Sequence, residues 1–252
     1  MEKLYNAIFH RKSIRKYDMT PLPTDVFSEI EQYATNVKSL VPTIKTKFSY
    51  LTAENVKNLL PIKAPHYVCI YSEKAEHYLM NVGFMLQQID LYLSARGIGS
   101  CWLGLAKPAK GVPTQISGMD FIIMLAFGNS AETLHRADVS EFKRKNMDEI
   151  GVVSGDYDIL NAVRLAPSAS NSQPWFITGN AEKIQVIRVK LGTIRALIYD
   201  KLNQIDIGIA LSHLYIAAKM KGKNVEFFYD KKDESTAPKG YEYMISATLS
   251  SC

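Results

Sequence analysis

The segment APSASNSQPW, residues 166–175, decides the fold of this chain. Five polar side chains lie between its two prolines, and a tryptophan ends it; the polar residues are Ser168, Ser170, Asn171, Ser172 and Gln173. Such a loop offers many hydrogen-bonding groups on a path that the prolines restrict. It is suited to hold the polar edge of a flat heterocycle or a polyol, while proline and tryptophan exclude water. The alternative is ordinary turn chemistry after a helix, with Trp175 in the core.

A second polar stretch, near the start of the chain, is basic. Arg11, Ser13 and Arg15 place two guanidinium groups and a hydroxyl within five residues. Guanidinium groups match phosphate oxygens in two-point contacts, and a hydroxyl adds a hydrogen bond without charge. A terminal phosphate is the natural ligand of such a segment. A solvated basic turn after a helix has the same composition, and the segment alone favours that interpretation.

The first half of the chain shows helical and strand patterns around the basic stretch. Apolar residues at three-and-four spacing predict a helix with Thr24 as N-cap that fades near Thr35. The same spacing predicts a long helix over residues 79–93, with Gly97 as its left-handed cap. Residues 36–64 have no clear period, and we expect an irregular arm with room for one short helix. Continuous apolar runs predict three strands, at residues 67–71, 99–104 and 121–127.

The second half repeats this order. It predicts a helix over 156–166, the polar loop, a strand over 184–189, a second long helix, and strands over 225–229 and 243–249. Four positions of the first long helix recur 125 residues later (206 − 81, for example): Asn81, Gly83, Leu86 and Gly97 pair with Asp206, Gly208, Leu211 and Gly222. Two amphipathic helices share some positions through their common period alone. The single offset predicts more, namely a chain that folds like two fused protomers with the long helices packed at the pseudo-interface.

Composition limits the class of protein. With 252 residues, 47% hydrophobic and 22% charged, the chain has the balance of a soluble globular protein. The formal charge of +5 is spread along the chain without a basic stripe, so we predict no nucleic-acid partner. Three scattered cysteines, Cys69, Cys101 and Cys252, have no zinc-site spacing and indicate a reducing, cytoplasmic setting without a metal. No membrane span and no leader segment are expected.

Three motifs together resemble the FMN-dependent nitroreductase family. They are RKSIRKY at residues 11–17, followed by a Pro-x-Pro at 21–23, GIGSCWLG at 97–104, and the APSxxNxQPW pattern at 166–175. The resemblance implies an α+β fold of the nitroreductase type, with two similar halves around central, mostly antiparallel sheets. The halves are expected at residues 1–150 and 151–252.

In the homodimeric members of that family, the basic segment of one subunit grips the FMN phosphate and the Pro-Ser-x-x-Asn loop reaches the same flavin from the other subunit. Here the basic segment lies only in the first half and the loop only in the second. The chain therefore resembles the single-chain, internally duplicated branch of the family. The resemblance implies one complete FMN site and the loss of its twin, because Val41-Pro42-Thr43 offers no counterpart of the loop.

The family's motifs suggest which residues hold FMN. By this resemblance, the basic segment and an arginine in KRKNMDEI (143–150) bind the phosphate, and the polar loop binds the ring and the ribityl chain. The backbone after the first long helix lies against flavin N5, so Cys101 is expected as a buried small residue rather than a nucleophile. His213 is expected in the core. The predicted cofactor-binding residues are Arg11, Lys12, Ser13, Arg15, Cys101, Trp102, Leu103, Gly104, Arg144, Pro167, Ser168, Ala169, Ser170 and Asn171.

The resemblance implies an oxidoreductase that takes hydride from NAD(P)H at flavin N5 and then reduces a small electron acceptor such as a nitroaromatic or a quinone. No catalytic side chain is predicted, and a monomer that folds as a pseudo-dimer is expected, with further dimerisation left open. One alternative is a flavin-binding protein that stores, senses or modifies the cofactor without an external acceptor. Another is a structural protein that kept the fold and lost FMN.

Overall fold

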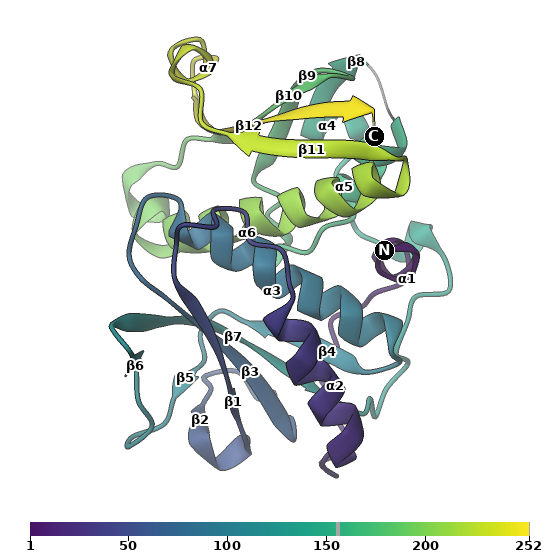
Figure 1. The fold of residues 1–252 in the computed structure, drawn as a ribbon, viewed down its shortest axis with the longest axis vertical. Coiled ribbons are helices and arrows are strands. Elements are labelled where there is room, and N and C mark those ends of the chain that lie inside the picture. The colour runs from purple at the N-terminus through teal and green to yellow at the C-terminus, as the bar shows by residue number, and fades with distance from the viewer. Residues whose placement is uncertain (155–156, 252) are drawn as a thin grey trace.

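Two long helices cross at the centre of the molecule, and a curled sheet lies on each side of the pair (Figure 1). The computed structural model describes residues 1–154 and 157–251, so Asp156 and Cys252, which the sequence analysis names, lie outside the described residues. The helices are α1 (Glu2–Ile8), α2 (Thr24–Thr35), α3 (Tyr78–Ala95), α4 (Met147–Ile150), α5 (Tyr157–Arg164), α6 (Thr193–Met220) and α7 (Lys231–Ser235). Short 3-10 turns are η1 (Ala53–Asn55), η2 (Val139–Glu141) and η3 (Ala169–Asn171). None of the helices described is both long enough and apolar enough to cross a membrane.

The two sheets have the same strand order. The strands are β1 (Thr46–Leu51), β2 (Val56–Lys57), β3 (His66–Ser72), β4 (Gly99–Leu103), β5 (Lys107–Pro108), β6 (Gln115–Ile116), β7 (Met119–Gly128), β8 (Gly151–Ser154), β9 (Trp175–Asn180), β10 (Lys183–Val189), β11 (Lys223–Phe228) and β12 (Tyr241–Ser251). The first sheet runs β1-β3-β7-β4, and the second runs β9-β10-β12-β11 with β8 added beside β9. All pairs are antiparallel except β8 with β9.

The equivalent strands also carry the same irregularity. The pairing of β3 with β7 shifts by one residue between Ile70 and Tyr71, and that of β10 with β12 shifts between Val186 and Ile187. A bulge at the same place in both sheets means that the halves share one topology in detail. This is the arrangement that a duplication requires, and the duplication itself stays a prediction.

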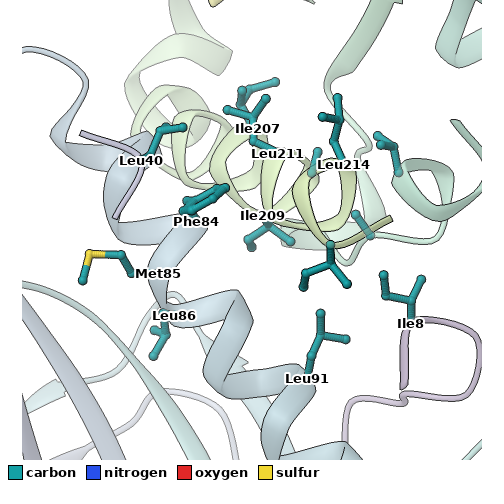
Figure 2. Packing of buried hydrophobic residues seen from close by; sticks show 14 of the residues in the cluster. Ile8, Leu40, Phe84, Met85, Leu86, Leu91, Ile207, Ile209, Leu211 and Leu214 are labelled. Carbon is teal, nitrogen blue, oxygen red and sulfur yellow. The ribbon is translucent and has the colours of Figure 1, made fainter. Parts of the chain in front are cut away.

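The long helices α3 and α6 cross where each has a glycine. A Cβ atom built on Gly208 would lie 2.0 Å from the backbone oxygen of Met80. A Cβ atom built on Gly83 would lie 2.0 Å from the backbone oxygen of Ile205. The two contacts are reciprocal, because their partners are also 125 residues apart (205 − 80). Backbone therefore meets backbone at the crossing, and apolar side chains of both helices pack around it (Figure 2).

Most of the expected elements are confirmed. The long helix, the strands over 67–71, 99–104 and 121–127 and the strands of the second half appear within a few residues, and Gly97 has the left-handed φ of 77° expected of a cap. The arm over 36–64 was wrongly expected to be irregular, since it contains the six-residue strand β1. Thr24 is the first helical residue rather than the N-cap, a position that Pro23 holds. The short strand β8 and helix α7 were not predicted.

Candidate functional site

Two segments at least 152 residues apart in the sequence (167 − 15) meet at a basic cavity of about 670 Å³. The basic segment after α1 forms one wall, and the polar loop before β9 forms another. The cavity is lined by Arg11, Lys12, Ser13, Arg15, Arg136, Glu141, Lys143, Arg144, Pro167, Ser168, Ser170 and Asn171. Six of these twelve side chains are basic and one is acidic, so the cavity is suited to an anion.

Arg11 is buried, and its charge is already balanced. Its Nε lies 2.9 Å from Oδ2 of Asp90, and its Nη2 donates to the hydroxyl of Ser13 at 3.1 Å. Asp90 also accepts hydrogen bonds from the Ser100 hydroxyl at 2.5 Å and from Nε2 of Gln87 at 3.0 Å. A buried ion pair with this many partners fixes geometry. Arg11 therefore anchors the basic segment on α3 and contributes little net charge to the cavity.

Arg144 supplies charge that no carboxylate of the described residues balances. Its Nη1 donates to Oδ1 of Asn171 at 2.6 Å and its Nη2 to the carbonyl of Leu165 at 3.2 Å. Its Nε is buried and has no partner among the described residues. Burial, together with the positive charges of Arg11 and Arg136, lowers the pKa of Arg144 to about 9. Such a crowded, partly unbonded guanidinium is stabilised when an anion binds beside it.

Arg136 joins this cluster, although the sequence analysis did not single it out. Its guanidinium donates to the backbone carbonyl of Arg11 and lies 4.0 Å from the ring centre of Phe142. Burial and the charge of Arg11 lower its pKa, and Glu141 opposes that shift in part. The only sign of Arg136 in the sequence is an isolated arginine in an irregular segment, which carries no motif.

The polar loop is held in an unusual backbone conformation. Ser170, Asn171 and Gln173 have positive φ values of 52°, 54° and 47°, although none is glycine. Each such residue costs on the order of 1–3 kcal/mol, and such residues cluster at functional sites. The loop is tied to α6 through the backbone N–H of Ala169, which donates to both carboxyl oxygens of Asp206 at 3.0 and 3.2 Å. The side chain of Asn171 also donates to the carbonyl of Lys143 at 2.7 Å, so the loop and the arginine segment hold each other.

A second cavity, of about 350 Å³, continues from the first and is mainly apolar. It shares Ser13, Arg15, Pro167, Ser168 and Ser170 with the basic cavity. Its other walls come from strands β4 and β7, from α6 and from the arm before β3: Leu60, Ile62, Cys101, Trp102, Gly104, Leu105, Ile123, Ala169, Tyr199, Leu202, Ile205, Asp206 and Ile209. A basic compartment joined to an apolar one fits a ligand with an anionic end and a flat ring.

Residues 3–218 match the model of a protein family described as "Putative TM nitroreductase". The chain belongs to this nitroreductase family. A solved structure described as a "putative nitroreductase" from Thermotoga maritima MSB8 is 22% identical, with a TM-score of 0.64 over 98% of this chain and 92% of that chain. This likeness confirms the α+β nitroreductase fold.

Other solved nitroreductases match about half of the chain. An FMN-dependent nitroreductase from Clostridium difficile R20291 is 18% identical, with a TM-score of 0.43, over 57% of this chain and 95% of its own. A nitroreductase family protein from Clostridium novyi NT is 19% identical, with a TM-score of 0.41, over 51% and 86%. No curated protein matches the chain. Membership in a nitroreductase family supports a general oxidoreductase role.

Most of the residues that the sequence assigns to the flavin line one of the two cavities of this nitroreductase-family chain. Cys101 is buried, and burial raises the pKa of its thiol to about 11, so it has the inert character expected of it. Lys12 lies at the rim and donates to the carbonyl of Thr133 at 3.1 Å. Leu103 is the exception, because its side chain is fully buried in the core cluster that also contains Cys101 and lines neither cavity. Gly104 faces Leu202, 3.2 Å from where a Cβ atom would lie.

Two buried ionisable groups lie close to the site. His213 is in the core, as expected: its Nδ1 donates to the carbonyl of Ala162 at 2.8 Å, and its Nε2 accepts from Gln87 at 3.1 Å. Burial lowers its pKa to about 3, so it is a neutral, structural histidine. Asp206 lines the apolar cavity, and burial raises its pKa to about 8. The sequence analysis named Asp206 only as the repeat partner of Asn81 and missed its place in the site.

Proposed function

We propose that this chain binds one FMN across the two cavities and uses it to reduce small electrophilic acceptors, such as nitroaromatics or quinones, with NAD(P)H as the electron donor. One observation carries the proposal. An arginine cluster, in which Nε of Arg144 is buried and has no partner among the described residues, adjoins an apolar cavity with which it shares lining residues. Phosphate oxygens would satisfy the cluster, and a ring of low polarity would fill the slot beside it.

On this proposal the residues divide the work between the two ends of the cofactor. Arg15, Arg136, Arg144 and Ser13 would hold the phosphate, while Arg11, balanced by Asp90, fixes the basic segment. The strained loop would present Ser168 and Ser170 to the middle of the cofactor, and the backbone after Cys101 would contact the ring. When bound, FMN supplies the hydride-transfer chemistry. The chain orients the ring and excludes water through the apolar walls of β4 and α6.

We also propose that residues 1–150 and 151–252 act as two fused protomers that build this one site together. The purified protein is therefore expected to be yellow and to release one FMN per chain after denaturation. The absorbance spectrum, and chromatography of the released flavin, check this. Two flavins per chain would contradict the lost twin site, and colourless protein that takes up no added FMN would indicate a chain that kept the fold and lost its cofactor.

The electron donor is tested by rapid mixing of the flavin-loaded protein with NADPH or NADH. We expect at least one of them to bleach the oxidised flavin band and a nitroaromatic or quinone to restore it. If neither nucleotide bleaches a confirmed flavin, the reductase proposal fails, and a flavin-storing or flavin-sensing protein becomes the better interpretation.

Arg144→Met is expected to weaken FMN binding by about ten- to hundredfold, because a charge-assisted hydrogen bond contributes roughly 1.5–3 kcal/mol. Quenching of FMN fluorescence during titration of the flavin-free protein measures the dissociation constant. Arg164→Met is the matched control, since Arg164 donates to Oδ1 of Asn161 from its Nε and Nη2 and lines neither cavity. Equal affinities of the two variants would show that the phosphate does not lie beside Arg144.

A further inference from the structure

A third cavity, of about 760 Å³, lies beside the apolar cavity. It shares Arg15, Leu60 and Ile62 with the apolar cavity, so the two are continuous. Its walls come from the chain after the basic segment and from the arm that links η1 to β3. The lining residues that neither of the other two cavities contains include Met19, Leu59 and Lys63. We call this feature the side groove.

The charge of the side groove is strongly one-sided. Its cations are Arg15, Lys16, Lys57 and Lys63, and no acidic side chain of the described residues lines it. Fourteen lining residues thus carry four positive charges, three of them on lysines that the proposed phosphate site does not use, whereas the whole chain carries a formal charge of only +5. Among the described residues, none of the four cations forms an ion pair. Positive charge that no ion pair balances attracts an anionic ligand.

Neighbouring groups leave most of this charge in place. Glu132, a carboxylate near the groove, accepts from the backbone N–H of Arg15 at 2.6 Å and of Lys16 at 3.3 Å and lies 3.9 Å from Nζ of Lys12, so it offsets charge only at the end of the groove near Lys16. Lys57 in β2 pairs directly with Lys107 in β5, which places like charges opposite each other. Like charges directly opposite each other in a sheet are destabilising, so the two lysines do not contribute to the stability of the fold by facing each other.

The neutral polar groups of the groove are occupied. The Tyr17 hydroxyl donates to the carbonyl of Ala126 at 3.3 Å, and the Tyr67 hydroxyl accepts from the N–H of Ala64 at 2.9 Å. Asn58 uses both ends of its amide within its own turn. What the groove offers a ligand is therefore cationic side chains and apolar surface, the latter including Leu59, which is 73% exposed. A ligand that uses both must combine an apolar ring with an anionic group.

We propose that the redox partner is such an anion, whose ring lies where the apolar cavity meets the side groove, beside the flavin ring, while its carboxylate or phosphate group lies in the side groove. This inference rests on the proposed function and specifies its substrate class. Two sources share the chemistry: the phosphates of the nicotinamide donor, and the anionic group of an aromatic acceptor. The lysines of the groove are then specificity residues, since they contact the partner away from the reacting ring.

The test measures binding to the oxidised protein as purified, so that no turnover occurs. Isothermal titration calorimetry with 4-nitrobenzoate, the uncharged 4-nitrobenzamide and NADP⁺ compares the unsubstituted protein with Lys57→Gln/Lys63→Gln. The matched control is Lys45→Gln/Lys47→Gln, which removes two exposed charges at β1, away from the groove. We expect an anionic probe to bind the groove variant about tenfold more weakly than the unsubstituted protein and to bind the control variant unchanged. High salt should likewise weaken its binding to the unsubstituted protein.

The probes separate the two sources. A loss for NADP⁺ alone assigns the groove to the donor, a loss for 4-nitrobenzoate alone assigns it to the acceptor, and a loss for both assigns it to a shared site. The proposal is overturned if 4-nitrobenzamide binds as tightly as 4-nitrobenzoate and the groove variant binds both anions like the unsubstituted protein. It is overturned equally if no probe binds. Failure of the proposed function is seen separately, in the flavin content and in the bleaching by NAD(P)H.

Discussion

Gly208→Ala is expected to lower the free energy of unfolding by on the order of 3 kcal/mol, because the new methyl group would overlap the backbone of the opposite helix. Its Cβ would lie 2.0 Å from the carbonyl oxygen of Met80 and 2.8 Å from the backbone nitrogen of Phe84. Neither atom belongs to a flexible side chain, so the helices themselves must separate. Alanine is the better helix former by about 1 kcal/mol, which offsets only part of this cost.

Urea unfolding followed by circular dichroism measures the effect. Gly192→Ala is the control, since a Cβ there meets nothing within 4 Å, and a loss below about 1 kcal/mol is expected at that helix start. Gly83→Ala should resemble Gly208→Ala, because the two contacts are reciprocal. The double variant should lose less than the two losses together, since one separation of the helices makes room for both methyl groups. Unchanged unfolding midpoints would contradict the close crossing.

The helix crossing is also the part of the fold that the sequence predicts best. Long amphipathic runs have a clear period, and a repeat at one offset indicates that the two runs are equivalent. The sheets are harder, because strand order depends on contacts between distant residues. Strand β1 was missed since its sequence, Thr46 to Leu51, mixes polar and apolar residues on a half-buried edge. This segment forms a strand because it pairs with β3, and nothing in the sequence of residues 46–51 indicates that pairing.

In the candidate site, too, only the parts that are contiguous in the sequence could be predicted. The basic segment and the polar loop are contiguous motifs, and both are visible in the sequence. Arg136 and Asp206 have no motif, and they reach the site only through the path of the chain, Arg136 by its bond to the backbone of Arg11 and Asp206 from the middle of α6. The lysines of the side groove are ordinary surface residues in the sequence. Only their shared cavity gives them a common role.

The place equivalent to the apolar cavity carries two aromatic rings in the other half. The pair Gly104 and Leu202, whose contact leaves the apolar cavity open, corresponds at the 125-residue offset to Tyr229 and His77 (104 + 125 and 202 − 125). The rings of Tyr229 and His77 lie 5.3 Å apart, centre to centre. Both rings line a cavity of about 480 Å³, so this place is not closed, and the proposal of one flavin per chain rests on the lack of a second polar loop in the sequence.

A further pair at the same offset shows what is special about Asp206. In the first half, Oδ1 of Asn81 accepts from the backbone N–H groups of Leu40 and Val41, as the Asp206 carboxyl accepts from that of Ala169. An uncharged amide oxygen thus suffices to tie a loop to its long helix. The second half has instead a carboxyl group that is only 3% exposed and lines the apolar cavity.

Asp206→Asn is therefore expected to stabilise the protein at neutral and alkaline pH, by on the order of 3–5 kcal/mol at about 1.4 kcal/mol for each unit of pKa difference. Burial raises the pKa of Asp206 from its ordinary value of 3.8 to about 8 in the folded chain. Between these values the unfolded chain is ionised and the folded chain keeps the proton. The stability from this group is complete below pH 3.8 and is lost as the pH rises through 8, whereas the amide loses nothing.

The measurement is the free energy of unfolding of both proteins from pH 4 to pH 9, at equal flavin occupancy, because a bound cofactor adds its own stabilisation. The difference between Asp206→Asn and the unsubstituted protein should grow as the pH rises from 4 and level off above 8. Asp25→Asn makes the same chemical change at an exposed position and should follow the unsubstituted protein. Parallel pH profiles for Asp206→Asn and the unsubstituted protein would mean that the folded chain carries the ionised carboxylate, stabilised beyond its bond to Ala169. The negative charge would then lie against the apolar cavity at all pH values of interest, and the chain would have to balance it with the arginines that we assign to the phosphate.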